Sequence, residues 1–240
     1  MDHVDHADQP DQPGRAARPS SPIREELRTA QATVLERWAT PGSFWTAAQR
    51  LAIVEQVRRA RDASPLAPWE APSGVDGLTG DGTELPAAAV DAVWRLTNHP
   101  GTLTHSWYQQ LLDRGLAAGP YVELVAVVAQ ANLVDRFADA LDLDRPPLPP
   151  PTPGAPTGEV APGCAVRDHW VPTAPIKGPN VIKALSLLPF ENGSRALLSD
   201  VHYVPDAALL GDLASGHGAL SRPQIELIAA RTSTLNECFY

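Results

Sequence analysis

The chain has 240 residues, a hydrophobic fraction of 43% and a formal net charge of -9, so it can bury the core of one large domain or two small ones. Its acidic balance comes without a lysine and arginine cluster, which argues against nucleic acid and anionic membrane as partners. No run of about 18 apolar residues is present, as a membrane-spanning helix would need. Residues 1–22 lack the basic start and apolar centre of a secretory signal. We expect a cytoplasmic protein with a disordered tail over residues 1–22.

Residues 23–145 carry apolar side chains at helical spacing. Aromatic residues make up only 6% of the chain, and alanine and leucine dominate its apolar residues, which favours helix over sheet. The segment 121–141 is apolar on nearly all faces and predicts the most buried, central helix. The other expected helices cover residues 22–38 and 46–62, a segment that starts at Pro86, and a segment between Thr104 and Gly115.

A proline-rich segment follows, with eleven prolines in the 35 residues from 145 to 179. Proline lacks the backbone N–H and fixes φ, so this segment cannot form a helix or an inner strand. We predict an extended linker over residues 146–179 that Trp170 and Val171 attach to a domain surface. Beyond it, Asn180 is expected to cap a helix that reaches Leu188. A capping-box pattern at Ser221 begins the last predicted helix.

The chain contains two cysteines, Cys164 in the linker and Cys238 near the end. This number is too small for a disulfide framework, so either both are incidental or one is reactive. Cys164 is interpreted as incidental, with a resolving thiol for Cys238 as the alternative. The histidines show no metal spacing, and no phosphate-binding or dinucleotide motif occurs. We therefore predict no metal and no cofactor.

The final segment, SRPQIELIAARTSTLNECFY, places Cys238 twelve residues after Glu226. It resembles the motif helix of the alkylhydroperoxidase D-like (AhpD-like), or carboxymuconolactone decarboxylase, family, in which a Glu precedes a Cys-x-x-Cys and a His. Residues 85–143, which include AVDAVWRLTNHPGTLT and YVELVAVVAQANLVDRFADAL, resemble the closing helices of that family. The two matches cover about half of the chain. The resemblance implies an all-α fold, an AhpD-like helical bundle.

An internal repeat accompanies this resemblance, because AQRLAIVEQVRRARDASPLA aligns with the final segment when Ser64 is placed under Cys238. In that register Ser64 and Ala67 occupy the two cysteine positions, and Ala52 occupies the position of the Glu. The resemblance therefore implies a degenerate unit over 23–145, the linker over 146–179, and a partial second unit over 180–240 that carries the motif helix.

The family's chemistry is thiol peroxidase or disulfide reductase activity, with Cys238 and Glu226 as the implied catalytic residues. The implied partners are a hydroperoxide or disulfide substrate, a thiol reductant and further copies of the chain in a homo-oligomer. The sequence stops after the first cysteine of the motif, so we expect the activity to be impaired. A true terminus, a partial gene model, a nonsense mutation and a recoded selenocysteine codon all fit the stop at Tyr240.

Two other functions stay open at this point. The first is a catalytically inactive helical assembly or binding protein. The second is decarboxylase-type activity on a lactone acid, for which the sequence offers no basic cluster. Glu123 stands out as an acid within an apolar helix. We interpret it as complementing the helix dipole in the first turn, with a buried functional acid as the alternative.

Overall fold

The computed structural model describes residues 23–80, 82–204 and 216–235. These residues form eight α-helices, two short 3₁₀ turns and no strand beyond two isolated bridges. The predicted all-α class is confirmed for them. The helices are α1 (Glu25–Trp38), α2 (Ala47–Asp62), α3 (Ala87–Asn98), α4 (His105–Asp113), α5 (Ala118–Ala140), α6 (Asn180–Lys183), α7 (Pro189–His202) and α9 (Arg222–Leu235); the turns are η1 (Pro72–Gly74) and η2 (Pro100–Thr102).

Local sequence signals set the limits of the first helices. The hydroxyl of Thr46 accepts the N–H of Gln49, whose side chain returns the contact to the Thr46 N–H, which completes a capping box at the start of α2. The hydroxyl of Thr104 accepts the N–H of Trp107 at the start of α4. Gly115 follows α4 with a φ of +90°, a value that glycine adopts without steric cost. The helices predicted within residues 23–145 are therefore confirmed.

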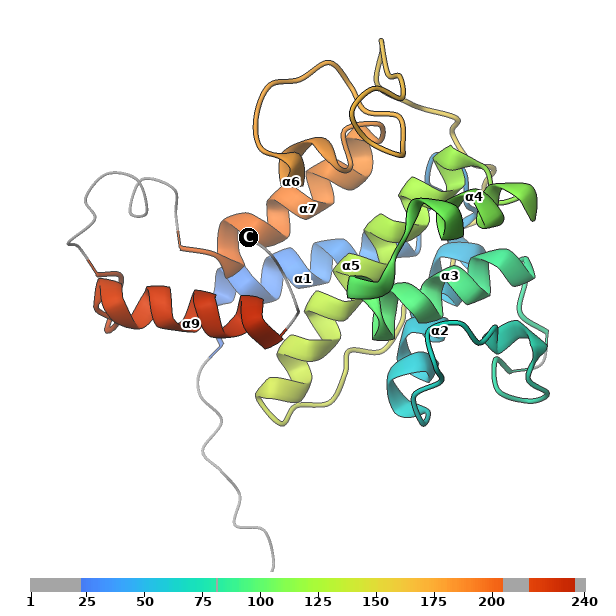
Figure 1. The fold of residues 1–240 in the computed structure, drawn as a ribbon. Coiled ribbons are helices and arrows are strands. Elements are labelled where there is room, and N and C mark those ends of the chain that lie inside the picture. Colours follow the sequence, from blue (N-terminus) through green and yellow to red (C-terminus); the bar gives the residue numbers. More distant parts are fainter. Residues whose placement is uncertain (1–22, 81, 205–215, 236–240) are drawn as a thin grey trace, which may run out of the picture.

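Helix α5 lies at the centre of the bundle (Figure 1) and packs against α2, α3 and α7. It buries 12 of its 23 residues, which is the largest number of any described helix. The shorter α3 buries a larger share, 8 of 12. The central position of α5 was predicted from its sequence, which is apolar on nearly all faces. No single described helix, α5 included, is long and apolar enough to cross a membrane.

The proline-rich segment runs over the surface of this bundle as an extended strap. Its backbone N–H groups at Thr152 and Thr157 donate to the carbonyls of Ala39 and Gly42, in the connection between α1 and α2. Further along, the Trp170 ring lies 5.6 Å from the His105 ring on α4, and Val171 packs against the core. The prediction that Trp170 and Val171 attach this segment to the domain is confirmed.

The prediction of a helix from Asn180 to Leu188 was wrong about where that helix ends. Helix α6 ends at Lys183, and Pro179 rather than Asn180 occupies its N-cap position. A separate helix that the sequence analysis missed, α7, begins at Pro189, where proline is tolerated because the first turn needs no N–H donor. Packing against α1 and α5 stabilises α7, and such tertiary contacts outweigh the poor helix propensity of Gly193.

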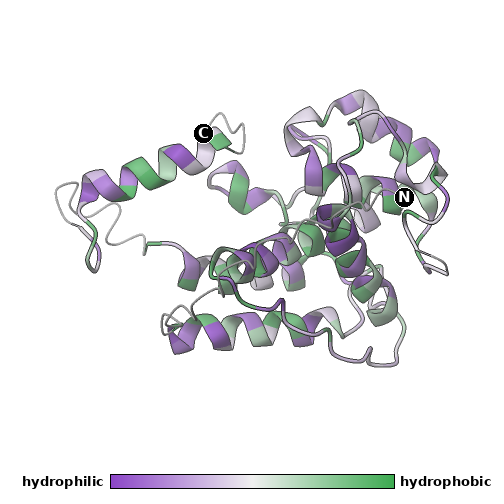
Figure 2. Cartoon of the chain, turned by 90° about the horizontal axis from the view of Figure 1, so that it is seen from below, coloured by the Kyte–Doolittle hydropathy of each residue, from purple (hydrophilic) through white to green (hydrophobic). Residues whose placement is uncertain are grey.

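The last described helix, α9, buries none of its residues, like the one-turn α6 and unlike the other six described helices. It lies at the side of the bundle in both views (Figures 1 and 2). Leu227, Ile228 and Leu235 expose more than half of their surface there. This helix therefore carries apolar side chains that no other described part of the chain covers.

Candidate functional site

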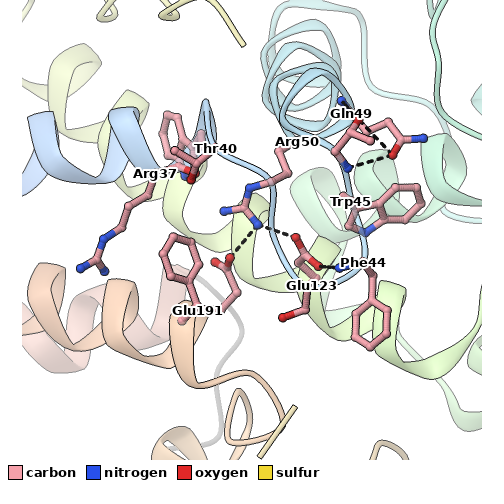
Figure 3. A network of polar contacts seen from close by, with 12 residues as sticks. Arg37, Thr40, Phe44, Trp45, Gln49, Arg50, Glu123 and Glu191 are labelled. Carbon is pink, nitrogen blue, oxygen red and sulfur yellow. Dashed lines mark hydrogen bonds and ion pairs between the residues drawn. The ribbon is translucent and has the colours of Figure 1, made fainter. Parts of the chain in front are cut away.

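The most concentrated group of charged side chains in the bundle is a buried cluster of Arg50, Glu123 and Glu191 (Figure 3). Helices α2, α5 and α7 each contribute one of these residues. One guanidinium nitrogen, Nη1 of Arg50, lies 2.5 Å from Oε1 of Glu123 and 2.6 Å from Oε1 of Glu191. The three side chains are at most 1% exposed, so a charge-assisted network joins three helices inside the core.

The second oxygen of each carboxylate also has a donor. The backbone N–H of Phe44 donates to Oε2 of Glu123 at 2.6 Å. The side-chain amide of Gln130 donates to Oε2 of Glu191 at 2.9 Å and in turn accepts the indole N–H of Trp38 at 3.0 Å. Buried carboxylates need such partners because desolvation makes an unpaired charge costly. Both acids are thus held by the backbone or by a neutral amide as well as by Arg50.

Arg50 itself is less completely paired than its carboxylates. Its Nε and Nη2 groups are buried without a hydrogen-bond partner. The guanidinium carbon lies 5.7 Å from the centre of the Phe190 ring, a distance at which the aromatic face attracts a cation. The single guanidinium group of Arg50 therefore pairs with two carboxylates, and the ring of Phe190 lies close to it.

Burial raises the pKa of Glu123 above its ordinary value, and this effect exceeds the opposing attraction of Arg50 and the Phe44 N–H. The neighbouring charge of Glu191 acts in the same direction as burial. The carboxyl group of Glu123 therefore takes up a proton more readily than an exposed glutamate does.

No space for a substrate is visible beside Glu123. A Cβ placed on Gly42 would lie 1.8 Å from Glu123 Oε1 and 2.5 Å from Arg50 Nη1. The backbone therefore touches the ion pair on this side. We conclude that the cluster connects helices α2, α5 and α7.

The interpretation of Glu123 as a first-turn residue that complements the helix dipole was wrong. Because α5 begins at Ala118, Glu123 falls beyond the first turn, and it points into the core.

The residues predicted from the motif lie in separate parts of the chain. Glu226 lies near the start of α9 and forms an ion pair of 2.6 Å with Arg222, four residues earlier. Cys238 lies outside the described residues. Ser64 is exposed just after α2, and Ala67 is half-buried in the same loop, where its N–H donates to Glu70 Oε2 at 3.0 Å. Among the described residues, Glu226 thus contacts Arg222, and its side chain is 56% exposed.

The starts of α2 and α9 share one local arrangement. The N–H and the hydroxyl of Thr46 contact Gln49 Oε1 at 3.0 and 3.3 Å, and those of Ser221 contact Gln224 Oε1 at 2.8 and 3.0 Å. Superposing these caps shifts the internal alignment by one residue, so that Leu51 rather than Ala52 corresponds to Glu226. In either register the first unit has no carboxylate at that position.

Cys164 is a free, half-buried thiol in the strap. It packs against the small cluster that includes Val122 and Leu185. No group of three or more metal-ligating side chains occurs among the described residues. Cys164 therefore sits in apolar surroundings.

Two hollows lie on the surface of α5. The first has a volume of about 410 Å³ and is lined by α3, α5, α6 and residues 168–173 of the strap. The second, of about 760 Å³, lies between α5, α6 and α7 and includes the charged side chains of Arg195 and Asp200. The sequence analysis did not find either of them, because each brings α5 together with segments more than 40 residues later in the sequence. The predicted attachment of Trp170 to the domain surface was the one sequence signal that lies beside the first hollow.

The fold and the buried cluster define an all-α helical protein whose core is crossed by an ion network. A comparison of the chain with protein-family models, with curated proteins and with solved structures finds no match.

Proposed function

We propose that this chain is a thiol-redox protein of the AhpD-like kind, in which Cys238 reacts with a hydroperoxide or a disulfide. The observation that carries the proposal is the common start of α2 and α9, each a hydroxyl residue whose N–H and side chain contact a glutamine three positions on. Two helices that begin in the same way are compatible with the duplicated unit that the AhpD-like resemblance implies, in a register that places Leu51 rather than Ala52 opposite Glu226. An all-α architecture is compatible with an AhpD-like bundle.

The proposed reaction follows ordinary thiol chemistry. The thiolate of Cys238 attacks one oxygen of the hydroperoxide, the O–O bond breaks, an alcohol leaves after taking a proton, and a sulfenic acid forms on Cys238. A thiol reductant then condenses with the sulfenic acid, which releases water and gives a mixed disulfide, and a second reductant thiol restores Cys238. Twelve helical residues would separate Glu226 from Cys238 by about 18 Å, so Glu226 transfers protons only through an intervening group.

The test compares the two cysteines of the 240-residue chain. Hydrogen peroxide is added, and oxidation of each cysteine is followed by mass spectrometry. We expect Cys238 to react roughly tenfold faster than Cys164, which is half-buried in apolar surroundings and therefore less accessible to peroxide. Without added reductant, peroxide turnover should stay near that of the Cys238→Ser variant, because these 240 residues hold no second motif cysteine to resolve the sulfenic acid. Equal oxidation rates for Cys238 and Cys164 would reject the proposal.

A second candidate function, a catalytically inactive helical assembly, is favoured by the exposed apolar side chains of α9. Leu227 is 69% and Leu235 is 66% exposed, and contiguous apolar surface of this kind marks an interaction site. We propose that α9 joins copies of the chain into a homo-oligomer. Sedimentation at micromolar concentration should show self-association that a double variant, Leu227→Ser with Ile228→Ser, removes. A monomeric wild-type protein would contradict this candidate.

A further inference from the structure

The smaller hollow on α5 has the features of a ligand site that is already formed. Its volume of about 410 Å³ falls within the range of small-molecule sites. Most of its surface is supplied by aliphatic and aromatic side chains, with one wall on the bundle and the other on the strap. The main apolar contributors are Leu96, Leu103, Val122, Val125, Tyr121 and Trp170.

The strap wall is fixed by several contacts that do not involve a ligand. Ala165 and Thr173 exchange two backbone hydrogen bonds, of 3.2 and 3.0 Å, on either side of the lining residues. Arg167 Nη1 donates to the Thr173 carbonyl at 3.1 Å, and the buried N–H of Ala174 donates to Ser186 Oγ at 2.9 Å. This part of the strap is therefore ordered before any ligand binds, which reduces the entropy that binding costs.

Trp170 is held in place by aromatic neighbours on α4. Its ring lies 5.6 Å from the ring of His105 and 6.4 Å from that of Tyr108, and Tyr108 in turn contacts Tyr121 at 5.0 Å. Burial, assisted by the neighbouring Tyr108, raises the pKa of Tyr121, so its phenol is neutral. The hollow thus has one aromatic side, formed by Trp170 and Tyr121, and one aliphatic side.

The charges of the lining decide which ligands fit. The lining contains no lysine or arginine, and its one acidic residue is Asp168, which is exposed. An anion would lose its hydration there without gaining a lysine or arginine as a partner. We infer that this hollow binds a small neutral molecule with an aromatic or hydrocarbon body, oriented by the polar groups of His169 and Thr173 at one edge. This site is separate from the proposed chemistry of Cys238, and neither requires the other.

The test uses two fluorescent probes of similar size, the neutral N-phenyl-1-naphthylamine and the anionic 8-anilinonaphthalene-1-sulfonate, each titrated into the full chain. The neutral probe should bind saturably at one site, and the anion roughly tenfold more weakly. Absence of saturable binding by the neutral probe would overturn the inference. Equal affinity for the anion would also overturn it.

Matched variants locate the binding site. Val125 faces the smaller hollow and Ala129, one turn further along α5, faces the larger one. Val125→Trp should raise the Kd of the neutral probe roughly tenfold, whereas Ala129→Trp should leave it within about twofold. Ala184→Trp fills the same hollow from an exposed position on α6 and should act like Val125→Trp, so the inference stays testable if Val125→Trp unfolds. A loss of binding in Ala129→Trp alone would overturn it.

Discussion

Two arginine–glutamate pairs of equal length lie in different regions of the molecule. In the bundle, Arg50 and Glu191 are 2.6 Å apart and at most 1% exposed; on α9, Arg222 and Glu226 are also 2.6 Å apart, but Glu226 is 56% exposed. The buried pair has no water to replace a lost partner, whereas solvent can replace one on α9. The two pairs therefore contribute very differently to the free energy of unfolding, although their distances are equal.

Removing one acid from each pair should give the largest contrast. Glu191→Ala leaves Arg50 and Gln130 buried with one partner fewer, and we expect it to lower the free energy of unfolding by about 4 kcal/mol. Glu226→Ala should cost less than about 0.5 kcal/mol, because the Glu226 side chain itself is 56% exposed. Urea unfolding of both variants measures the difference. A similar loss in the two variants would show that burial does not separate the pairs.

The contact of Gly42 with the cluster offers a second test. Gly42→Ala places a methyl group where Glu123 Oε1 and Arg50 Nη1 now lie, and we expect a loss of about 3 kcal/mol in the free energy of unfolding. The control is Gly74→Ala, since no atom lies within 4 Å of its new Cβ. An unchanged stability of Gly42→Ala would mean that the cluster can move aside without cost.

The cluster should also give the bundle an unusual pH dependence. The pKa of Glu123 is raised in the folded state, so folding favours its protonated form. That contribution to stability is present below the ordinary glutamate pKa and is lost as pH rises through the folded-state pKa. The stability of wild type relative to Glu123→Gln should therefore fall as pH rises above about 4.5. Urea unfolding across this range provides the measurement.

Asp139 supplies the control of opposite sign for that experiment. Its pKa is lowered, chiefly by the side-chain hydrogen bond from Arg145, so its contribution is lost as pH falls. Asp139→Asn should accordingly reduce the loss of stability toward acid pH. If Glu123→Gln changed the pH dependence in the same direction as Asp139→Asn, a raised pKa for Glu123 would be untenable.

The smallest expected effect concerns the two helix caps. Thr46→Ala removes the hydroxyl that caps α2, and it should lower the free energy of global unfolding by about 1 kcal/mol. Ser221→Ala removes the corresponding group from α9, which buries no residue. It should lower helix content slightly in circular dichroism without moving the unfolding midpoint. A shifted midpoint in Ser221→Ala would show that α9 unfolds together with the bundle.

The sequence predicted most of the helices because their signals are local. Thr46 and Thr104 mark helix starts, Gly115 marks an end, and the apolar pattern of residues 121–141 predicts a central helix. Each signal depends on residues within a few positions of one another, which interact in the same way in many folds. The same reasoning missed α7, because Pro189 and Gly193 are poor local indicators and packing against α1 and α5 stabilises that helix.

The buried cluster, in contrast, was decided by the tertiary structure alone. Arg50, Glu123 and Glu191 lie on three helices, with 73 residues between the first two and 141 between the first and last. No local pattern distinguishes Arg50 from the exposed arginines of the chain, and the apolar helix around Glu123 marked that residue as unusual without indicating its partners. The sequence by itself determined most of the helical segments within residues 23–145. Only the folded chain determined which charges lose their water, because burial depends on contacts between distant segments.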